Sequence, residues 1–223
     1  MSNVAIILGA GNGTRMGIDK SKLLLEINGK TVIQRSVETF LSIKDIDRVI
    51  VTVRKNDVEL FSKILNDKRI TFVIGGDTRQ QSVKNAVDTI DSCELVIIHD
   101  GARPLVTKDT IISTIDNAKK YKAAATGVKV KDTIKVVDDN GYIVDTPNRD
   151  SLVAIQTPQI FDFELYKNAM AQAIKDKKDF TDDCKLVENY GEKVKVVIGE
   201  YTNIKITTPD DVVVAQQILK KGE

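Results

Sequence analysis

Short apolar runs alternate with amphipathic stretches along most of the chain. Runs rich in Val, Ile and Ala predict strands at residues 4–8, 48–53, 70–74, 95–99, 123–128, 194–198 and 204–207. Apolar positions at helical spacing predict helices at residues 31–40, 57–65, 78–90, 107–121, 163–175, 182–190 and 209–220. Thr107 stands where the fourth of these helices needs an N-cap, and Gly191 follows the sixth as a C-cap. The alternation predicts an α/β fold, with a Rossmann-like, mostly parallel sheet and helices on both faces.

The alternation stops after residue 130, where the sequence becomes more polar. Two β-rich runs, residues 133–137 and 142–146, flank Asp138-Asp139-Asn140-Gly141, and an Asn-Gly turn between such runs is a strong hairpin signal. From these residues alone, the hairpin is either a decorative edge or an arm that docks on another subunit. Because the sequence shows no internal repeat, low-complexity tract or linker, we expect a single domain at 1–223 with a protruding β-hairpin at about 131–150.

Composition and charge exclude several classes of protein. The 33 Lys and Arg residues nearly balance the 32 Asp and Glu residues, and aromatic residues make up only 5% of the chain, which argues against a nucleic-acid binder. No apolar run approaches the roughly 18 residues of a membrane helix, and no signal peptide is evident, so we expect a cytoplasmic protein that does not contact a membrane. Cys93 and Cys184 lie far apart in sequence and are expected to be buried or partly buried free thiols.

Candidate chemistry gathers in three turns that follow predicted strands, at residues 9–17, 75–77 and 100–103. In an open α/β sheet, ligands bind at the carboxyl ends of the strands. The first turn, GAGNGTRMG, has Thr14 and Met16 where a dinucleotide fingerprint needs glycine, and Asp19 where a Walker A motif needs glycine. Its glycines nevertheless let backbone N–H groups approach an anion, and Arg15 and Lys22 add two cations. The alternative is a flexible surface turn with solvated charges.

Seven sequence motifs, in order and over nearly the whole chain from about residue 3, favour the anion-binding interpretation. They are GAGNGTRMG followed by SKLLLEINGK, GGDTRQQSV (75–83), HDGARP (99–104), VKDTIK (130–135), NRDSLVAIQTPQ (148–159), FTDD (180–183) and NIKITTPDD (203–211). Together they resemble the 2-C-methyl-D-erythritol 4-phosphate cytidylyltransferase family. Two positions depart from the family pattern: Ser21 stands where proline is usual, and Gly101 where alanine is common. A mobile Lys22 loop is expected from the first departure, and only a mild effect from the second.

The resemblance implies transfer of CMP from CTP to the phosphate of methylerythritol phosphate, with release of pyrophosphate and use of Mg²⁺. A phosphate oxygen is already an adequate nucleophile, so the protein needs to position groups and neutralise charge rather than supply a base. This agrees with a chain whose only histidine, His99, is expected to be a hydrogen-bonded core residue. By resemblance, Arg15 and Lys22 stabilise the transition state, and the nucleotide pocket is lined by Ala10, Gly11, Gly76, Asp77 and Ser82.

The resemblance also implies an acceptor site and a homodimer. The positions that match the polyol-phosphate site are Thr133, Arg149, Thr157, Thr181 and Lys205. Asp100 is expected to bind substrate or the metal, with Mg²⁺ held mainly by phosphates, or else to cap nearby amides as a turn residue. Arg103 either contacts substrate or pairs with Asp100 or Asp77. The hairpin is expected to embrace a second subunit, so that Thr133 and Arg149 reach the partner's site.

Three other functions remain to be weighed. A ribitol 5-phosphate cytidylyltransferase would share the fold and the chemistry and differ in its acceptor. A nucleotide-binding module without catalysis would be expected to lose Arg15 or Lys22, and both are present. A nucleic-acid binder is disfavoured by the balanced charge.

Overall fold

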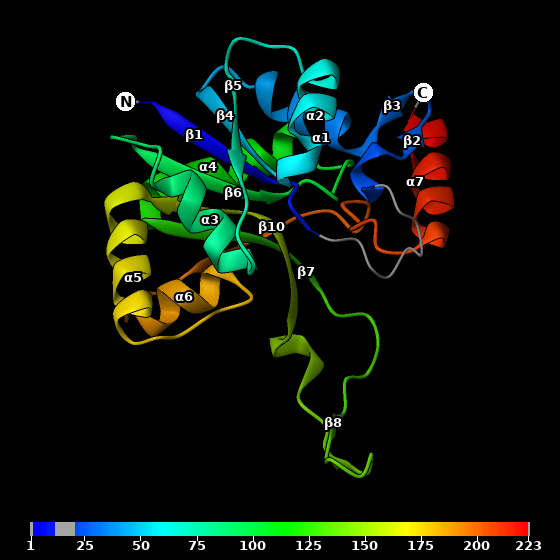
Figure 1. The fold of residues 1–223 in the computed structure, drawn as a ribbon. Helices are drawn as coiled ribbons and strands as arrows, with labels where there is room; N and C mark the ends of the chain where they lie inside the picture. The colour runs from blue at the N-terminus through cyan, green and yellow to red at the C-terminus, as the bar shows by residue number, and fades with distance from the viewer. Residues whose placement is uncertain (1, 12–20, 223) are drawn as a thin grey trace.

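Seven strands form the central sheet, in the order β11-β7-β10-β6-β1-β4-β5 (Figure 1). The computed structural model describes residues 2–11 and 21–222. The strands are β1 (Asn3–Leu8), β4 (Ile46–Val53), β5 (Ile70–Ile74), β6 (Leu95–Asp100), β7 (Ala123–Lys129), β10 (Val153–Asp162) and β11 (Lys195–Ile198). Two short hairpins lie outside this sheet, β2 (Glu26–Ile27) with β3 (Lys30–Thr31) and β8 (Val136–Val137) with β9 (Ile143–Asp145).

The mostly parallel sheet agrees with the prediction from the sequence. Strands β6, β1, β4 and β5 run parallel in succession, and β11 runs parallel to β7. In β1, Ala5 and Ile7 pack into one core cluster and Val4 and Ile6 into the other, so the strand is apolar on both faces. A strand that is covered on both faces has no polar side, which is why it reads as a continuous apolar run.

Helices cover both faces of the sheet, as the alternation predicts. One face is packed by α1 (Val32–Leu41), α2 (Val58–Ile64), α4 (Lys108–Tyr121) and α7 (Pro209–Gly222). The other is packed by α3 (Arg79–Val87), α5 (Phe163–Lys175) and α6 (Asp183–Asn189), which lie together in Figure 1. No helix in the described part of the chain combines the length and the apolar character that crossing a bilayer would require.

Both predicted helix caps are confirmed. The side chain of Thr107 accepts a hydrogen bond from the backbone N–H of Thr110, at 3.2 Å. Gly191 follows α6 with a φ of +102°, a left-handed conformation that glycine adopts without steric cost.

Two features of the sheet differ from the sequence prediction. Strand β10 was not predicted, although it lies inside the sheet, between β6 and β7 and antiparallel to both. Its polar middle, Gln156-Thr157-Pro158-Gln159, hides the strand pattern, because a proline and buried polar side chains are unusual there. The strand predicted at residues 204–207 is wrong. This segment is not part of the sheet, and its Ile206 donates a backbone hydrogen bond of 2.8 Å to Ala102 in the turn after β6.

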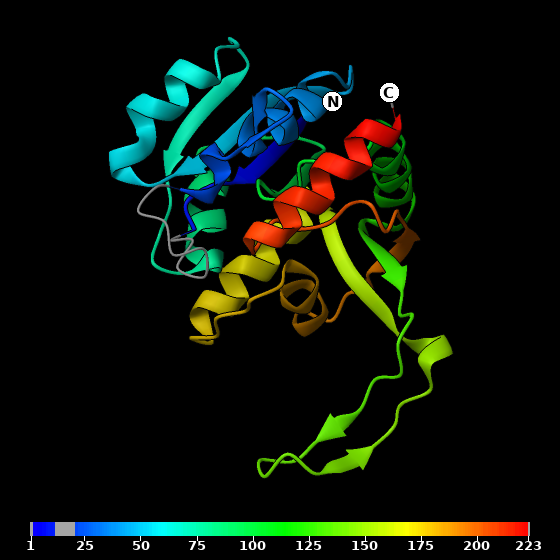
Figure 2. The same cartoon turned by 90° about the vertical axis from the view of Figure 1, so that its right-hand side faces the viewer.

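The predicted hairpin projects away from the sheet and its helices (Figure 2). Its paired strands, β8 and β9, are shorter than the predicted runs at 133–137 and 142–146. Gly141 has a φ of +84° and closes the turn by donating to the carbonyl of Asp138 at 3.0 Å. Apolar side chains are exposed along the hairpin: Ile134, Val136, Val137, Tyr142, Ile143 and Val144.

Candidate active site

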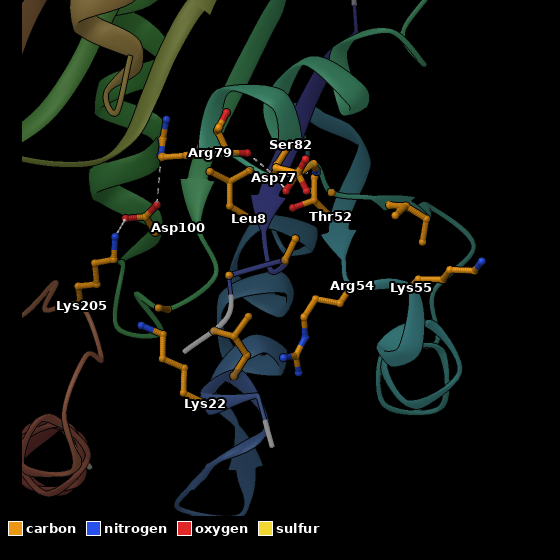
Figure 3. Close-up of a pocket in the computed structure, with 18 of the residues that line it drawn as sticks. Leu8, Lys22, Thr52, Arg54, Lys55, Asp77, Arg79, Ser82, Asp100 and Lys205 are labelled. Atoms are coloured by element: carbon orange, nitrogen blue, oxygen red, sulfur yellow. Dashed lines mark hydrogen bonds and ion pairs between the residues drawn. The ribbon is translucent and has the colours of Figure 1, made fainter. Parts of the chain in front are cut away.

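A cleft of about 590 Å³ opens at the carboxyl ends of β1, β4, β5 and β6 (Figure 3). It is the place where the topology of an α/β sheet is expected to bind a ligand. Four turns line it: residues 8–11 after β1, 52–55 at the end of β4, 74–79 after β5 and 100–102 after β6. The segments that carry Lys22 and Lys205 complete the lining.

Glycines in the first and third turns allow neighbouring walls of the cleft to pack closely. A Cβ atom on Gly75 would lie 2.3 Å from the Cβ of Ala10. A Cβ on Gly9 would lie 2.6 Å from the backbone oxygen of Thr52. Such contacts are far shorter than van der Waals distances, so glycine at 9 and 75 is required for the close approach of the cleft walls.

The turn after β5 is organised by Ser82 and Thr78. Thr78 is the N-cap of α3, and the hydroxyl of Ser82 donates to its backbone oxygen at 3.0 Å. The same hydroxyl oxygen accepts a 3.0 Å hydrogen bond from the backbone N–H of Gly76. These bonds hold Gly76 and Asp77 in the wall of the cleft. Ser82 therefore shapes the pocket as well as lining it.

Asp100 lies among three cationic side chains. Lys205 Nζ is 2.7 Å from its carboxylate, Arg103 Nε is 3.7 Å away and Arg79 Nε is 3.9 Å away. Burial would raise the pKa of Asp100, but these cations outweigh it, Lys205 and Arg79 foremost, and lower the pKa to about 2. The carboxylate is ionised at neutral pH, and the cluster as a whole is positive, so it favours an anionic ligand.

A chain of hydrogen bonds supports Asp100 from behind. Its backbone N–H donates to the hydroxyl of Thr157 at 3.0 Å, and that hydroxyl lies 3.1 Å from His99 Nδ1. His99 Nε2 lies 3.2 Å from the carbonyl oxygen of Arg103, which can only accept, so Nε2 carries the proton. His99 is buried, and burial lowers its pKa to about 4. The prediction of a hydrogen-bonded core histidine is confirmed.

Arg103 and Lys205 have different surroundings. Arg103 is nearly buried, donates to the backbone oxygen of Asn203 at 2.8 Å and does not line the cleft. Asp100 and Asp77 were the two expected ion-pair partners of Arg103, and the structure places Arg103 beside Asp100. Lys205 lines the cleft with a side chain that is 39% exposed. It lies on a segment outside the strands and helices, and its ammonium group pairs with Asp100.

The structure brings together only part of the expected site. The cleft is lined by Ala10, Gly11, Lys22, Gly76, Asp77, Ser82, Asp100 and Lys205. Arg103 and Thr157 contact Asp100 from outside the cleft lining. Arg15 lies outside the described residues.

Three expected acceptor residues lie away from the cleft lining. Thr133 is exposed on the hairpin. Arg149, also exposed, begins a 3₁₀ turn at Arg149–Ser151 and donates to the backbone oxygen of Lys131 at 2.9 Å. Thr181 is exposed just before α6. None of the three lines the cleft of its own chain.

Sequence reasoning missed three cationic cleft residues. Arg54 and Lys55 follow β4 at the same sheet edge as the other turns, and that position was the available signal. Arg79 stands inside the motif GGDTRQQSV and begins α3. Its contacts with Asp100 and Asp183 come from different parts of the fold, so spacing in the sequence does not reveal them.

The described residues do not make a metal site built from protein ligands alone. Within residues 2–11 and 21–222, no group of three or more His, Cys, Asp and Glu side chains is placed to hold a metal ion. Asp77 and Asp100 are the carboxylates in the described lining, and Asp100 is already surrounded by cations. Such a cleft fits a metal that arrives on a polyphosphate, since Mg²⁺ usually keeps waters and binds phosphates with one or two carboxylates.

Comparisons with known proteins agree with this geometry. The family model for "IspD: 2-C-methyl-D-erythritol 4-phosphate cytidylyltransferase" matches residues 3–221. An enzyme of that name from Caldanaerobacter subterraneus subsp. tengcongensis is 47% identical, with 99% of this chain and 100% of that protein covered. Another from Clostridium perfringens is 44% identical, covering 97% of this chain and 98% of that one.

Solved structures give the same result. The 4-diphosphocytidyl-2C-methyl-D-erythritol synthase of Anaerococcus prevotii superposes with a TM-score of 0.88 at 39% identity, covering 98% of this chain and 96% of that one. The 2-C-methyl-D-erythritol 4-phosphate cytidylyltransferase of Thermus thermophilus gives a TM-score of 0.82 at 29% identity, covering 99% and 100%. One explanation thus accounts for the sequence motifs, the mixed sheet with its projecting hairpin and the cationic cleft: this chain belongs to the 2-C-methyl-D-erythritol 4-phosphate cytidylyltransferase family.

Proposed function

We propose that the protein transfers CMP from CTP to 2-C-methyl-D-erythritol 4-phosphate, giving 4-diphosphocytidyl-2-C-methyl-D-erythritol and pyrophosphate. The family match over residues 3–221 carries this assignment and does not favour ribitol 5-phosphate as the acceptor. The cleft supports it, because glycine-rich turns and cationic side chains suit a nucleoside triphosphate. CTP is an intracellular metabolite, so we place the reaction in the cytoplasm.

The reaction is an in-line displacement at the α-phosphorus of CTP. A bond forms from an acceptor phosphate oxygen to phosphorus, and the bond from phosphorus to the pyrophosphate oxygen breaks. A phosphate dianion needs no base, so catalysis consists of positioning and charge neutralisation. Figure 3 shows the amino groups of Lys22 and Lys205 directed to the same side of the cleft. We assign the stabilisation of transition-state charge to Lys22 and to Arg15.

The nucleotide occupies the wall formed by the first and third turns. Ala10, Gly11, Gly76 and Asp77 offer backbone groups on this wall, and Ser82 holds it in shape. Backbone donors and acceptors can distinguish a pyrimidine by its hydrogen-bonding edge without a large side-chain set.

The acceptor phosphate binds on the opposite side, beside Asp100 and Lys205. Lys205 supplies a partly exposed ammonium group at this position, and Arg103 and Thr157 support Asp100 from outside the cleft lining. We also assign Thr181 to the acceptor site, from its match to the family motif FTDD. A positive cluster around one carboxylate suits a molecule with a phosphate at one end and hydroxyl groups along its length, because the carboxylate accepts hydroxyl hydrogens.

We propose that Mg²⁺ enters with CTP. It would be held mainly by the triphosphate, with Asp100 as the carboxylate that faces it, directly or through water. When bound, it supplies Lewis-acid neutralisation of phosphate charge. Lys205, Arg79 and Arg103 hold Asp100 ionised, which keeps its oxygens available as acceptors at neutral pH.

We propose that the hairpin joins two chains into a homodimer. A two-stranded hairpin is marginally stable alone in water, and this one exposes apolar side chains such as Val137, which is 55% exposed. Thr133 and Arg149 lie on or beside it and do not line the cleft of their own chain. In a dimer they would reach the acceptor site of the partner.

Val137→Asp should shift the mass measured by light scattering toward that of a monomer, because it places a charge in the proposed apolar interface. An unchanged mass would contradict an apolar hairpin interface.

Pyrophosphate release tests the assignment of the reaction. The assay compares methylerythritol 4-phosphate with ribitol 5-phosphate, each with CTP and Mg²⁺. Preference for the first is expected. Preference for the second would keep the mechanism and change the acceptor, and release with neither would leave a nucleotide-binding protein without this activity.

A further inference from the structure

Arg79 connects the cleft with the buried side of the sheet. It is the first residue of α3 and lines the cleft with a side chain that is 25% exposed. Its Nε faces Asp100 Oδ1 at 3.9 Å, and its terminal nitrogen pairs with Asp183 Oδ2 at 2.6 Å. One guanidinium group thus lies between a carboxylate in the cleft and a carboxylate in the interior.

Asp183 is an unusual interior residue. Its side chain is 3% exposed, so burial raises its pKa, and Arg79 opposes that shift by stabilising the charged form. Its second oxygen, Oδ1, accepts a 2.7 Å hydrogen bond from the hydroxyl of Tyr166, which is fully buried on α5. Oδ1 is therefore hydrogen-bonded and Oδ2 is ion-paired with Arg79, so the buried charge has one partner on each oxygen.

The segment that carries Asp183 is bound to the start of α3 at further points. The hydroxyl of Thr78 donates to Asp179 Oδ1 at 3.0 Å. Gln80 donates to the carbonyl of Lys178 at 3.1 Å and accepts from the backbone N–H of Phe180 at 2.8 Å. These contacts flank Arg79 on both sides in the sequence. The backbone of Arg79 is thereby held against its anchor before any ligand binds.

Arg79 and Lys205 differ in how freely they can leave Asp100. Lys205 is a flexible point charge with 39% of its side chain exposed, whereas Arg79 is held by a buried ion pair. In the proposed reaction, Lys205 turns to a substrate phosphate, and Asp100 then loses its close partner. Two arginines then remain beside the carboxylate, Arg103 at 3.7 Å from Oδ2 and Arg79 at 3.9 Å from Oδ1. Arg79 is the one that faces the oxygen opposite to Lys205, so without it Oδ1 would have no cation to keep the carboxylate from turning with the lysine.

We propose that Arg79 is a positioning residue, anchored by Asp183 and Tyr166, that holds the Asp100 carboxylate in place while Lys205 binds a phosphate group of the substrates. The inference rests on the proposed function, since it assigns Lys205 to phosphate. It adds a residue that acts through Asp100, together with a buried anchor on α6 that touches no substrate. If the ion pair between Arg79 and Asp183 had only a structural role, it would join α3 to α6 and would not affect the position of Asp100.

Steady-state kinetics of matched variants separate the two roles. Arg79→Lys keeps the charge but cannot span both carboxylates, and Asp183→Asn keeps an oxygen for Tyr166 and removes the anchoring charge. Misplacement of a reacting group by about 1 Å costs on the order of 100-fold in rate, so we expect Arg79→Lys to lower kcat about 10- to 100-fold. We expect about 10-fold for Asp183→Asn, and a change below about threefold in the Kd for CTP, measured by calorimetry.

The double variant gives the decisive comparison. If Asp183 acts through Arg79, the loss of kcat in Arg79→Lys/Asp183→Asn equals that of Arg79→Lys alone. Multiplied losses, or normal kcat with only a lower Tm, would overturn the proposal. If Asp183→Asn does not fold, Tyr166→Phe replaces it, because it removes one hydrogen bond and leaves both charges. Tyr166→Phe is expected to lower kcat about threefold in the otherwise unmodified protein, and to cause no further loss of kcat when it is added to Arg79→Lys.

Two controls separate positioning from general destabilisation. Arg69→Lys makes the same replacement at a surface pair with Asp67, and Thr114→Val removes a buried hydroxyl bonded to Thr126. Both should keep the kcat of the unmodified protein, and an equal loss in them would refute the role of Arg79. Failure of the proposed function looks different, because the unmodified protein would then release no pyrophosphate with methylerythritol 4-phosphate.

Discussion

Replacing Asp100 by asparagine should destabilise the fold in a way that depends on pH. The pKa of Asp100 is about 2 in the folded protein and 3.8 as an ordinary carboxyl. A folded pKa below the unfolded one contributes stability above the unfolded pKa and loses it as pH falls toward the folded pKa. A difference of 1.8 units, from 3.8 to 2, corresponds to about 2 kcal/mol at pH 7. The contribution should fall to about half of that near pH 3.

Urea unfolding of both proteins at pH 7, 5 and 3 measures this contribution. The difference in free energy of unfolding between the natural protein and Asp100→Asn should be about 2 kcal/mol at pH 7 and pH 5 and about 1 kcal/mol at pH 3. Carboxylates that lie away from Asp100, Arg79 and His99 titrate alike in both proteins, so their effects cancel. Asp45→Asn is the control, because Asp45 pairs with Lys119 on the surface and should matter little at any pH. An equal difference at all three pH values would refute the role of the three cations.

Three further predictions concern the cleft and the hairpin. Lys22→Ala should lower kcat about 100- to 1000-fold while changing the Kd for CTP much less, because the charge it meets is greatest in the transition state; equal losses in kcat and CTP binding would contradict that role. Arg149→Ala should raise the KM for the acceptor and leave the KM for CTP nearly unchanged, and the reverse pattern would show that Arg149 is misplaced. Gly75→Ala should lower the free energy of unfolding by about 1–3 kcal/mol and weaken CTP binding, because its Cβ would meet Ala10 at 2.3 Å; calorimetry that finds unchanged CTP affinity would contradict the close approach of the two turns.

The elements that the sequence predicts well are those whose pattern is local. Strands such as β1 and β6 are apolar on both faces, and helix ends carry residues such as Thr107 and Gly191 that act on their immediate neighbours. Strand β10 was missed because its central residues are polar for a reason that lies elsewhere in the fold. Thr157 supports Asp100 and His99, and Gln159 donates to Asp182. A strand whose side chains support the site therefore lacks the apolar pattern from which strands are predicted.

The residues of the candidate site divide in the same way, into those that local sequence predicts and those that depend on the fold. The turns after β1, β5 and β6 could be located from the sequence, since topology alone places them at one edge. Arg79 could not, because its partners Asp100 and Asp183 lie on separate elements. Glycine at position 101, where the family commonly has alanine, was expected to be a mild departure. In this structure a Cβ at Gly101 would lie 2.8 Å from Leu8 O and from a side-chain carbon of Ile33. Sequence spacing carries no information on such close packing.

The hairpin has a place in the topology that bears on how the enzyme can change. It connects β7 to β10, two neighbouring antiparallel strands whose pairing begins at Lys129 and Val153. The whole projection is therefore an insertion between two strands that a tight turn could join, and its length is independent of the register of the sheet. The cleft lies at the ends of other strands, β1, β4, β5 and β6. In the proposed dimer, acceptor recognition and subunit assembly can therefore diverge by lengthening, shortening or recombining one loop, while the cleft that we assign to the nucleotide is inherited unchanged.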